Sequence, residues 1–450
     1  MMKNTSILDP LAPQSSPCQV TIDKLVSGGT GLARHDAQVV MVKGGLPGET
    51  VLIHKGEKHR GVLYAELLEV LVPSKERSIP PCPLFNQCGG CQLQHMNETH
   101  QLLQKETILR ETLARVGKFS KLSIHPIIPS LSALGYRNSA RFTVFQRHNT
   151  FHVGLFKEGT RKAILVDNCL LIQEPLHQVI REVADRLQTQ TSLPVFLQSV
   201  EARWSSFSKE ALLIFRGIYQ RRDQANRLLE VLGDIPHVVG RIVELAPSIR
   251  KGSPKASRCL DGKESLMERF GELTFRIGAR SFMQSNWPVY NAIGRRMSDW
   301  LGALSGQRVL ELYAGMGAIG VSMAREGARS TLVEANPYAL ADARQSASLN
   351  HVGRCRFRAA SVEEFLPSVH RDEYDIVIVD PPRTGLTSTV ITEFVRVRIP
   401  RLLYLSCDVP TLARDLSRLV SNGYRIAQIQ PFDMFPQTSH IETLVELALE

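Results

Sequence analysis

Two apolar stretches late in the chain stop at residues that can do chemistry. Residues 401–406 (RLLYLS) have the composition of a buried strand and are followed by Cys407. Residues 374–379 (YDIVIV) are followed by Asp380, two prolines and an arginine. Because ligands bind at the carboxyl ends of parallel strands in α/β sheets, we expect this thiol and this carboxylate to share one sheet edge. Considered alone, Cys407 is better explained as one more buried free cysteine, and the context of the site reverses this preference.

A glycine-rich turn precedes these stretches. Residues 308–314 (RVLELYA) form a strand pattern that runs into Gly315 and Gly317, and residues 330–333 are a second strand pattern ending at Glu334. In nucleotide-type sites the glycines let the backbone approach a ligand, and an acid about 20 residues further on accepts hydrogen bonds from ribose hydroxyls. The chain lacks the third glycine of the dinucleotide fingerprint and a phosphate-binding lysine, which favours adenosine without a pyrophosphate. The pattern therefore predicts an S-adenosylmethionine site.

A thiol beside a methyl donor suits methylation of uracil C5. This carbon is too weak a nucleophile to attack a methyl donor unaided, but addition of a thiolate at C6 turns the ring into an enolate. C5 keeps its proton after methylation, so a base must remove it before the thiolate is eliminated. Cys407 is the candidate nucleophile, and Glu442, just before the last predicted strand, is the candidate base. On its own, an acid such as Glu442 is most often a surface residue.

The elements that must position these residues are those of a doubly wound α/β domain. After about residue 280 the chain alternates apolar strands with helical patterns, as such domains do. Near the start, short strand patterns at residues 20–25, 38–42 and 63–72, separated by glycine turns, predict a small β-barrel. Barrels of this kind often bind RNA, although a purely structural module would have the same pattern.

Three cysteines with the spacing C-x5-C-G-G-C follow the barrel: Cys82, Cys88 and Cys91. In a reduced compartment such close thiolates indicate metal ligation rather than disulfides, and Cys169 is the candidate fourth ligand. Four thiolates suit a structural zinc or an iron–sulfur cluster, and the spacing alone does not separate the two. Chance clustering of core cysteines is the remaining alternative.

Arginines and aromatic residues are frequent between residues 135 and 157. Arg137, Arg141 and Arg147 lie in strand-like stretches there, a composition that can grip a phosphate backbone and stack bases. A solvated sheet face explains these arginines equally well.

The overall composition is that of a soluble protein with two to four domains: 450 residues, 43% hydrophobic and 22% charged. A net charge of +10 favours a polyanionic partner such as nucleic acid. The first residues lack a signal-peptide or transit-peptide pattern, and no apolar run reaches membrane-spanning length. We therefore expect a cytoplasmic protein without a membrane partner, and a monomer.

Five motifs, taken together, resemble the RNA uracil-5-methyltransferase family. In chain order they are FMQSN at 282–286, LELYAGMG at 310–317, DPPRTG at 380–385, SCDVPTLARD at 406–415 and PQTSHIE at 436–442. The N-terminal barrel resembles a TRAM domain. The four cysteines resemble the [4Fe-4S] ligands of the branch of the family that acts on 23S ribosomal RNA.

The resemblance implies roles for particular residues. It implies Cys407 as nucleophile and Glu442 as general base. It also implies a donor site that includes Gln284, Tyr313, Glu334 and Asp380 beside the two glycines. Ala314 and Ala318 stand where many members have Cys and Asn, and the missing side chain at 318 affects one cofactor contact but not the reaction.

The expected organisation has four parts: a flexible tail at 1–16, a TRAM-like RNA-binding barrel at 17–75, a central α+β domain with the cluster at 76–280, and a Rossmann-like S-adenosylmethionine-dependent methyltransferase domain at 281–450. The tRNA-specific branch usually lacks barrel and cluster, which favours 23S ribosomal RNA over tRNA. An inactive RNA-binding assembly factor is a further alternative, but its mark would be loss of Cys407, Asp380 or Glu442. Cytosine C5-methyltransferases typically carry the nucleophile after a proline, unlike this chain.

Overall fold

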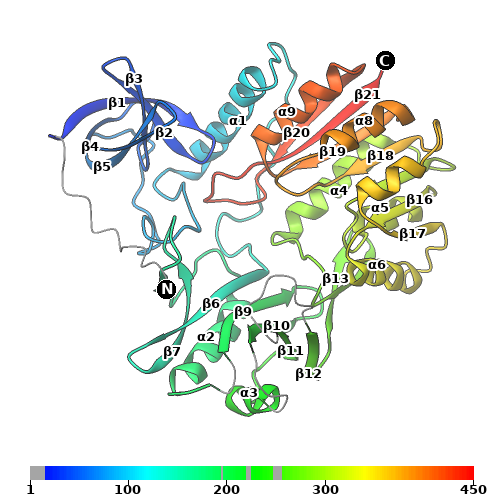
Figure 1. The fold of residues 1–450 in the computed structure, drawn as a ribbon, viewed down its shortest axis with the longest axis horizontal. Coiled ribbons are helices and arrows are strands. Elements are labelled where there is room, and N and C mark those ends of the chain that lie inside the picture. Colours follow the sequence, from blue (N-terminus) through cyan, green and yellow to red (C-terminus); the bar gives the residue numbers. More distant parts are fainter. Residues whose placement is uncertain (1–15, 194–195, 219–223, 247–255) are drawn as a thin grey trace, which may run out of the picture. The chain divides into compact units, whose positions relative to one another are not determined.

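The computed structural model describes residues 16–193, 196–218, 224–246 and 256–450, shown as a ribbon in Figure 1. Apart from its last residue, the predicted tail at 1–16 lies outside the described residues. The chain divides into two compact units. The first comprises Met1–Asn86, Gly90–Ile108 and Gln437–Ser439, and the second comprises Gln87–Gly89, Leu109–Pro436 and His440–Glu450.

A closed five-stranded barrel forms most of the first unit. Its strands are β1 (Cys18–Val26), β2 (Thr30–His35), β3 (Gln38–Val42), β4 (Thr50–His59) and β5 (Val62–Val72), hydrogen-bonded in the order β1-β2-β3-β5-β4. Alternate residues such as Val20 and Ile22 point into a dry core. Glu49 is fully buried, and the Arg77 guanidinium donates to its carboxylate. The predicted barrel is confirmed.

Helix α1 (Glu98–Arg115) has its last residues in the second unit, which contains two large sheets. The first sheet has the order β12-β11-β10-β9-β6-β7-β8. Its strands are β6 (Ser139–Arg147), β7 (Thr150–Phe156), β8 (Ala163–Leu165), β9 (Phe196–Ser205), β10 (Glu210–Ile218), β11 (Val238–Ala246) and β12 (Ala256–Gly262). Helices α2 (Glu174–Gln188) and α3 (Gln224–Leu232) share a hydrophobic core with it, in which Phe142 and Phe215 are fully buried.

A hairpin of β13 (Ser265–Phe270) and β14 (Leu273–Gly278) leads to the second sheet, whose order is β17-β16-β15-β18-β19-β21-β20. Its strands are β15 (Arg308–Leu312), β16 (Arg329–Glu334), β17 (Cys355–Ala359), β18 (Ile376–Val379), β19 (Arg401–Ser406), β20 (Tyr424–Phe432) and β21 (Glu442–Leu449). The flanking helices are α4 (Trp287–Leu301), α5 (Ala318–Arg325), α6 (Pro337–Leu349), α7 (Val362–Phe365), the 3₁₀ turn η1 (Leu366–Ser368), α8 (Ser388–Val397) and α9 (Val409–Val420).

The second sheet is the predicted doubly wound one. Strands β15 to β19 pair in parallel, while β21 is antiparallel to both β19 and β20. All four residues of β18 are buried, because helices cover both faces of a parallel sheet. The chain reverses direction across the sheet between β15 and β18, and ligands bind outside the carboxyl ends of strands at such a switch point.

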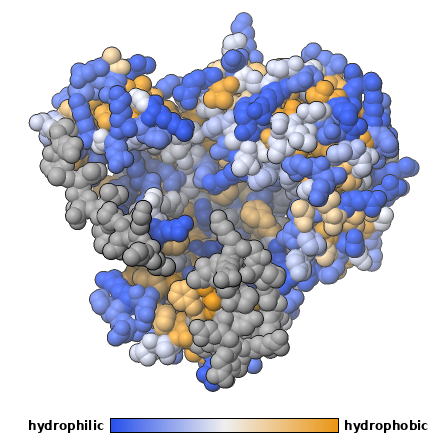
Figure 2. All heavy atoms as spheres, viewed as in Figure 1, coloured by the Kyte–Doolittle hydropathy of each residue, from blue (hydrophilic) through white to orange (hydrophobic). Residues whose placement is uncertain are grey.

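Hydrophilic side chains cover most of the face drawn in Figure 2, with hydrophobic atoms gathered in small groups between them. No helix in the described ranges is both long and apolar enough to span a membrane.

Candidate active site

The carboxyl edge of the second sheet carries the predicted site residues. Tyr313 directly follows β15, Glu334 is the last residue of β16, Asp380 follows β18, and Cys407 follows β19. All four are half-buried, so their side chains are neither lost in the core nor freely solvated. The structure therefore brings the predicted donor residues and the predicted nucleophile to one edge.

Glu442 reaches this edge from a different kind of strand. It is the first residue of β21, rather than lying before the strand as predicted, and it is 6% exposed. Because β21 is antiparallel to β19 and pairs Thr443 with Ser406, its first residue lies beside the last residues of β19. Continuing this register by one residue places Cys407 opposite Glu442, and the charge of Glu442 acts on the Cys407 thiol. The predicted base and nucleophile are thus neighbours across two hydrogen-bonded strands.

The glycine turn after β15 forms a cradle for a ligand. Gly315 has a φ of +54°, its amide donates to Glu334 Oε2 at 2.8 Å, and the space where a Cβ would stand is open. The second carboxylate oxygen of Glu334 accepts from the Asn336 amide at 2.7 Å, which fixes the acid at the strand end. Gly317, with φ of +75°, packs closely against Leu332. These residues fit a ribose and adenosine ligand, as the sequence predicts.

Gln284 lies half-buried in the segment between β14 and α4. Asn286 caps α4 through its side chain, and its amide nitrogen donates to the Met434 carbonyl at 3.1 Å. This bond ties the Gln284 segment to the loop that leads to Glu442. Phe282 in the same segment is 69% exposed, unusual for so large an apolar side chain.

A cluster of buried acids surrounds the site. Burial raises the pKa of Glu311 to about 8 and that of Asp380 to about 7. Burial and the nearby charge of Asp380 raise the pKa of Glu442 well above its usual value. The charges of all three acids reach Tyr290 on α4, whose own pKa is raised mainly by its burial. Carboxylates that crowd together in a buried site take up protons, and a positively charged ligand beside them favours their ionised forms.

Glu311 was missed by the sequence reasoning. Its signal is a single acid within the otherwise apolar strand pattern at residues 308–312.

Arg383 is a cation whose charge acts on both proposed reacting groups, Cys407 and Glu442. Burial and the charges of Glu442 and Asp380 raise the pKa of the Cys407 thiol to about 11, while Arg383 acts in the opposite direction. Arg383 also lowers the pKa of Glu442 and donates to Nε2 of His440 at 3.3 Å.

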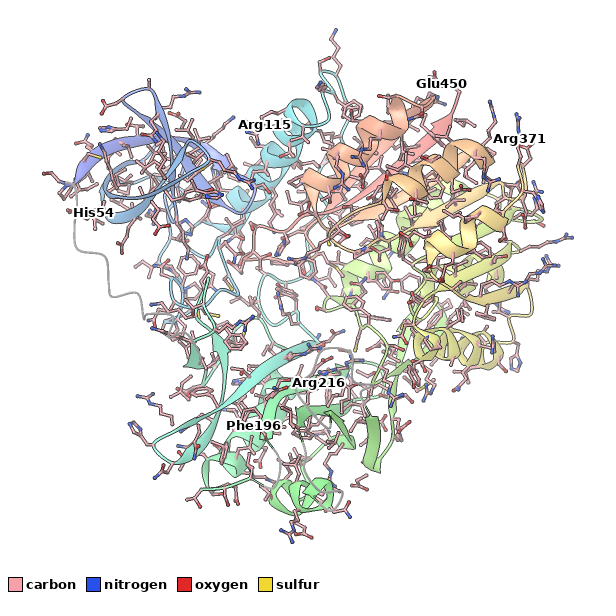
Figure 3. All side chains as sticks on the ribbon, in the orientation of Figure 1. His54, Arg115, Phe196, Arg216, Arg371 and Glu450 are labelled. Atoms are coloured by element: carbon pink, nitrogen blue, oxygen red, sulfur yellow. The ribbon has the colours of Figure 1, made fainter. Side chains whose placement is uncertain are left out.

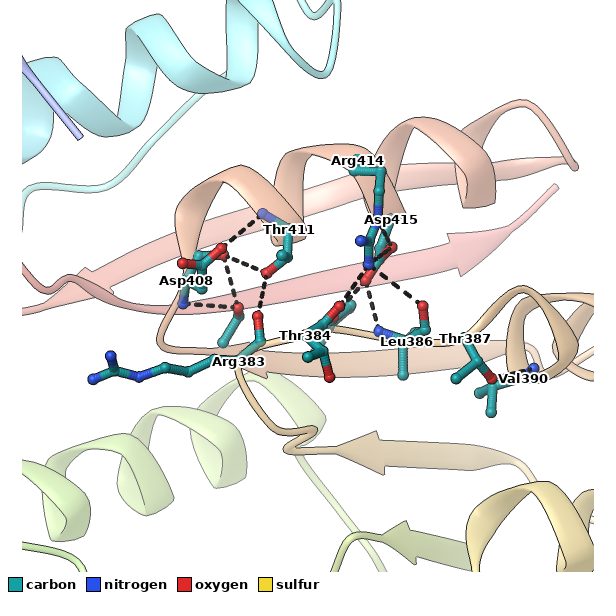
Figure 4. A network of polar contacts seen from close by, with 11 residues as sticks. Arg383, Thr384, Leu386, Thr387, Val390, Asp408, Thr411, Arg414 and Asp415 are labelled. Carbon is teal, nitrogen blue, oxygen red and sulfur yellow. Dashed lines mark hydrogen bonds and ion pairs between the residues drawn. The ribbon is translucent and has the colours of Figure 1, made fainter. Parts of the chain in front are cut away.

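Helix α9 fixes the loop that carries Arg383, as Figure 4 shows. Buried Asp415 accepts hydrogen bonds from the Leu386 amide at 2.8 Å and from the Tyr404 hydroxyl at 2.9 Å. The Arg414 guanidinium donates to the Thr384 carbonyl at 2.9 Å. Since α9 begins two residues after Cys407, with Asp408 as its N-cap, the thiol and the Arg383 loop are both positioned by this helix.

The four cysteines of the predicted cluster, Cys82, Cys88, Cys91 and Cys169, are all half-buried. The Cys82 amide donates to the Gln94 side chain at 3.2 Å, and Cys88 forms an isolated β-bridge with Lys157. Within residues 16–193, 196–218, 224–246 and 256–450, no group of three or more His, Cys, Asp or Glu side chains is arranged to hold a metal ion. The iron–sulfur cluster stays a prediction.

The three arginines singled out in the sequence have different surroundings. Arg137 lies near the rings of Tyr136 and Phe435, at 5.9 and 6.0 Å from their centroids. Arg141 forms an ion pair with Glu201, whereas Arg147 is exposed at the end of β6. Neither interpretation of the group, phosphate grip or solvated face, describes all three.

Comparison with known proteins identifies the family of this chain. A family model described as tRNA (Uracil-5-)-methyltransferase matches residues 97–449, and a TRAM domain model matches residues 18–68. An uncharacterized RNA methyltransferase of Halalkalibacterium halodurans is 30% identical over 96% of this chain and 97% of its own length. An uncharacterized RNA methyltransferase of Synechocystis is 28% identical over 99% of this chain and 98% of its own length.

A solved structure extends the similarity to three dimensions. The Pyrococcus abyssi tRNA (uracil-54, C5)-methyltransferase, in complex with S-adenosyl-L-homocysteine, superposes with a TM-score of 0.75 at 25% identity, covering 96% of this chain and 99% of its own. The fold, the family models and these relatives agree, and the chain belongs to the S-adenosylmethionine-dependent RNA (uracil-5-)-methyltransferase family.

Proposed function

We propose that this enzyme transfers a methyl group to C5 of a specific uridine in 23S ribosomal RNA, with Cys407 as nucleophile and Glu442 as general base. The observation that carries the proposal is the pairing of β19 with β21, which sets a thiol and a buried carboxylate side by side at the ligand edge.

The reaction requires the Cys407 thiol to lose its proton, and the Arg383 guanidinium is the group that favours the thiolate. The thiolate adds to uracil C6, and the ring electrons move to C5 and the O4 enolate. When bound, S-adenosylmethionine would supply the methyl group that C5 takes, and its sulfonium sulfur would leave as the neutral thioether of S-adenosylhomocysteine. Glu442 next accepts the C5 proton, the C5–C6 double bond reforms, and the C6–S bond breaks to return the thiolate.

Gln284, Tyr313, Gly315, Gly317, Glu334 and Asp380 form the donor site in this proposal. The support is the open cradle at Gly315 and the Glu334 carboxylate bound to its amide. Asp380 lies between this cradle and Cys407 in strand order, because β18 separates β15 from β19. The loss of the usual Asn at position 318 places a buried alanine at the start of α5.

The same proposal includes a [4Fe-4S] cluster on Cys82, Cys88, Cys91 and Cys169, in a central domain spanning residues 76–280. It rests on the close spacing of three half-buried cysteines. Purified without oxygen, the protein should contain about four irons and four sulfides. Cys169→Ser should lower both contents, and zinc in their place would overturn the proposal. The protein is taken to be cytoplasmic and monomeric.

A tRNA substrate is the second candidate. It is favoured by the P. abyssi protein, named for tRNA uracil-54, because the alignment covers 96% of this chain and so includes most of the barrel. The barrel therefore does not separate the two RNAs, and the choice of 23S ribosomal RNA rests on the cysteine motif.

The deciding experiment is transfer of labelled methyl from S-adenosylmethionine to protein-free 23S ribosomal RNA and to tRNA, followed by mass mapping of the product nucleoside. We expect 5-methyluridine at one position of 23S ribosomal RNA. Label in tRNA alone would keep the chemistry and replace the substrate. No label in either, from protein with an intact cluster, would favour an RNA-binding assembly factor without activity.

A further inference from the structure

The turn formed by residues 278–281 leads from β14 into the segment that carries Phe282 and Gln284. One side of this turn is held by Asp342 on α6, which is 2% exposed. The Asp342 carboxylate accepts a hydrogen bond from the Gly278 amide at 2.7 Å and another from the Ser281 hydroxyl. A side chain at 278 would collide with this carboxylate, so only glycine fits there.

The other side of the turn is held by Arg203 on β9. Its Nη1 donates to the Gly278 carbonyl at 3.0 Å and to the Ser281 carbonyl at 2.8 Å. One guanidinium nitrogen therefore joins the two ends of the turn. Arg203 is 5% exposed, and a buried charge of this kind is stable only when it is paired.

Glu201 supplies the pairing. Its carboxylate accepts from Arg203 Nε at 2.7 Å, and it also binds Arg141 and Arg216, both at 2.7 Å. Arg216, labelled in Figure 3, belongs to β10 and pairs in addition with Glu244. Burial alone would raise the pKa of Glu201, but the three guanidiniums lower it to about 2, so the carboxylate stays charged.

The turn has space to move into when it is not held. A cavity of about 250 Å³ lies against it, lined on the turn side by Gly278, Ala279 and Arg280. The Arg280 carbonyl accepts from Asn336, which lies two residues after Glu334 in the donor site. A shift of the turn would therefore disturb both Gln284 on one side and the Glu334 strand end on the other.

We propose that Arg203 is a positioning residue for methyl transfer. Held by Glu201, it joins the carbonyl groups of Gly278 and Ser281 and thereby sets the place of Gln284 in the donor site. In this proposal Arg203 acts through the turn and not by contact with substrate or methyl donor. The inference rests on the proposed function, because Gln284 is a donor-site residue only within it.

The test compares Arg203→Met with Arg216→Met. Both variants remove one guanidinium from the same carboxylate, but only Arg203 contacts the turn. We expect Arg203→Met to raise the dissociation constant for S-adenosylmethionine, measured by equilibrium dialysis, and to lower kcat/KM by about 10- to 100-fold, since a displacement of about 1 Å can cost that much. Arg216→Met should change both values less than about threefold. Both thermal midpoints are measured alongside.

A double-mutant cycle with Gln284→Ala separates positioning from general damage. If Arg203 acts through Gln284, the Arg203→Met and Gln284→Ala double variant should be no weaker than the worse single variant. Multiplying losses would overturn the proposal, as would equal binding by Arg203→Met and Arg216→Met. If Arg203→Met does not fold, Arg203→Lys takes its place in the cycle, because it keeps the charge beside Glu201 but not the fork. Donor binding is read without RNA, so absence of methylation by the wild type would reject the proposed function and leave this test intact.

Discussion

Replacing Glu311 with glutamine should remove a pH-dependent instability from the protein. Burial first, and then the charges of Asp380 and Glu334, raise the pKa of Glu311 to about 8 from 4.5, against a hydrogen bond from the Gly320 amide. Between these two pH values the folded protein holds a proton that the unfolded chain has lost. Stability therefore falls as the pH rises through this window, by about 1.4 kcal/mol for each pH unit.

Between pH 4.5 and pH 8, the titration of Glu311 should lower the free energy of unfolding by about 5 kcal/mol in total. A glutamine at this position would keep an oxygen for the Gly320 amide but cannot ionise. We therefore expect Glu311→Gln to flatten the pH dependence relative to the wild type, whatever constant offset the new amide group introduces. Asp380 and Glu442 titrate in both proteins, so the difference between the two curves belongs mainly to Glu311.

The assay is urea unfolding at several pH values from 5 to 8 without methyl donor. Glu272→Gln, which removes an exposed acid in the β13–β14 turn, is the control and should leave the slope unchanged. S-adenosylmethionine carries a positive sulfonium, so its stabilising effect should be larger at pH 8 than at pH 6, and S-adenosylhomocysteine should show less of this difference. Equal pH slopes for wild type and Glu311→Gln would refute the reasoning.

Other expectations concern the reacting groups. Cys407→Ala should abolish methylation and leave RNA affinity, measured by filter binding, within a few-fold of the wild type; turnover near the wild-type rate would reject the nucleophile. Glu442→Gln should still form the covalent RNA adduct but release it slowly, so an adduct should accumulate on denaturing gels, and its absence would reject the base. Because the pKa of Cys407 is about 11, its alkylation by iodoacetamide should rise about tenfold for each pH unit between 8 and 10. A plateau below pH 9 would contradict this. Arg383→Gln should slow the alkylation at pH 9, since it removes the cation that favours the thiolate.

The strand-end residues were predictable because parallel strands deliver their last residues to one edge. A buried apolar run that ends in Glu334, Asp380 or Cys407 contains this information in the sequence alone. To predict the position of Glu442 beside Cys407, the order of the strands in the sheet must be known as well. That β21 lies between β19 and β20 is a matter of long-range pairing, which no local pattern encodes.

The residues that position the site, such as Arg203, could not be predicted from the sequence for a different reason. Arg203 contacts backbone carbonyls 75 and 78 residues away. Every residue has a backbone carbonyl, so the residue types in the sequence do not indicate which carbonyl an arginine will bind. The predicted metal ligands stay a prediction, because the described residues hold no group of three or more side chains arranged for a metal ion. The raised pKa of Glu311 depends on burial, so its charge could be read from the sequence but its protonation could not.

The attachment of Cys407 and Glu442 to neighbouring strands has a consequence for motion. The ladder between β19 and β21 would have to break before the thiol and the carboxylate could part. Thermal motion of the protein therefore moves both groups together. The target uracil must then move instead: it has to leave its base stack and enter the space between the Cys407 thiol and the Glu442 carboxylate. Stiffening the RNA around its target should slow such an enzyme far more than stiffening the enzyme itself.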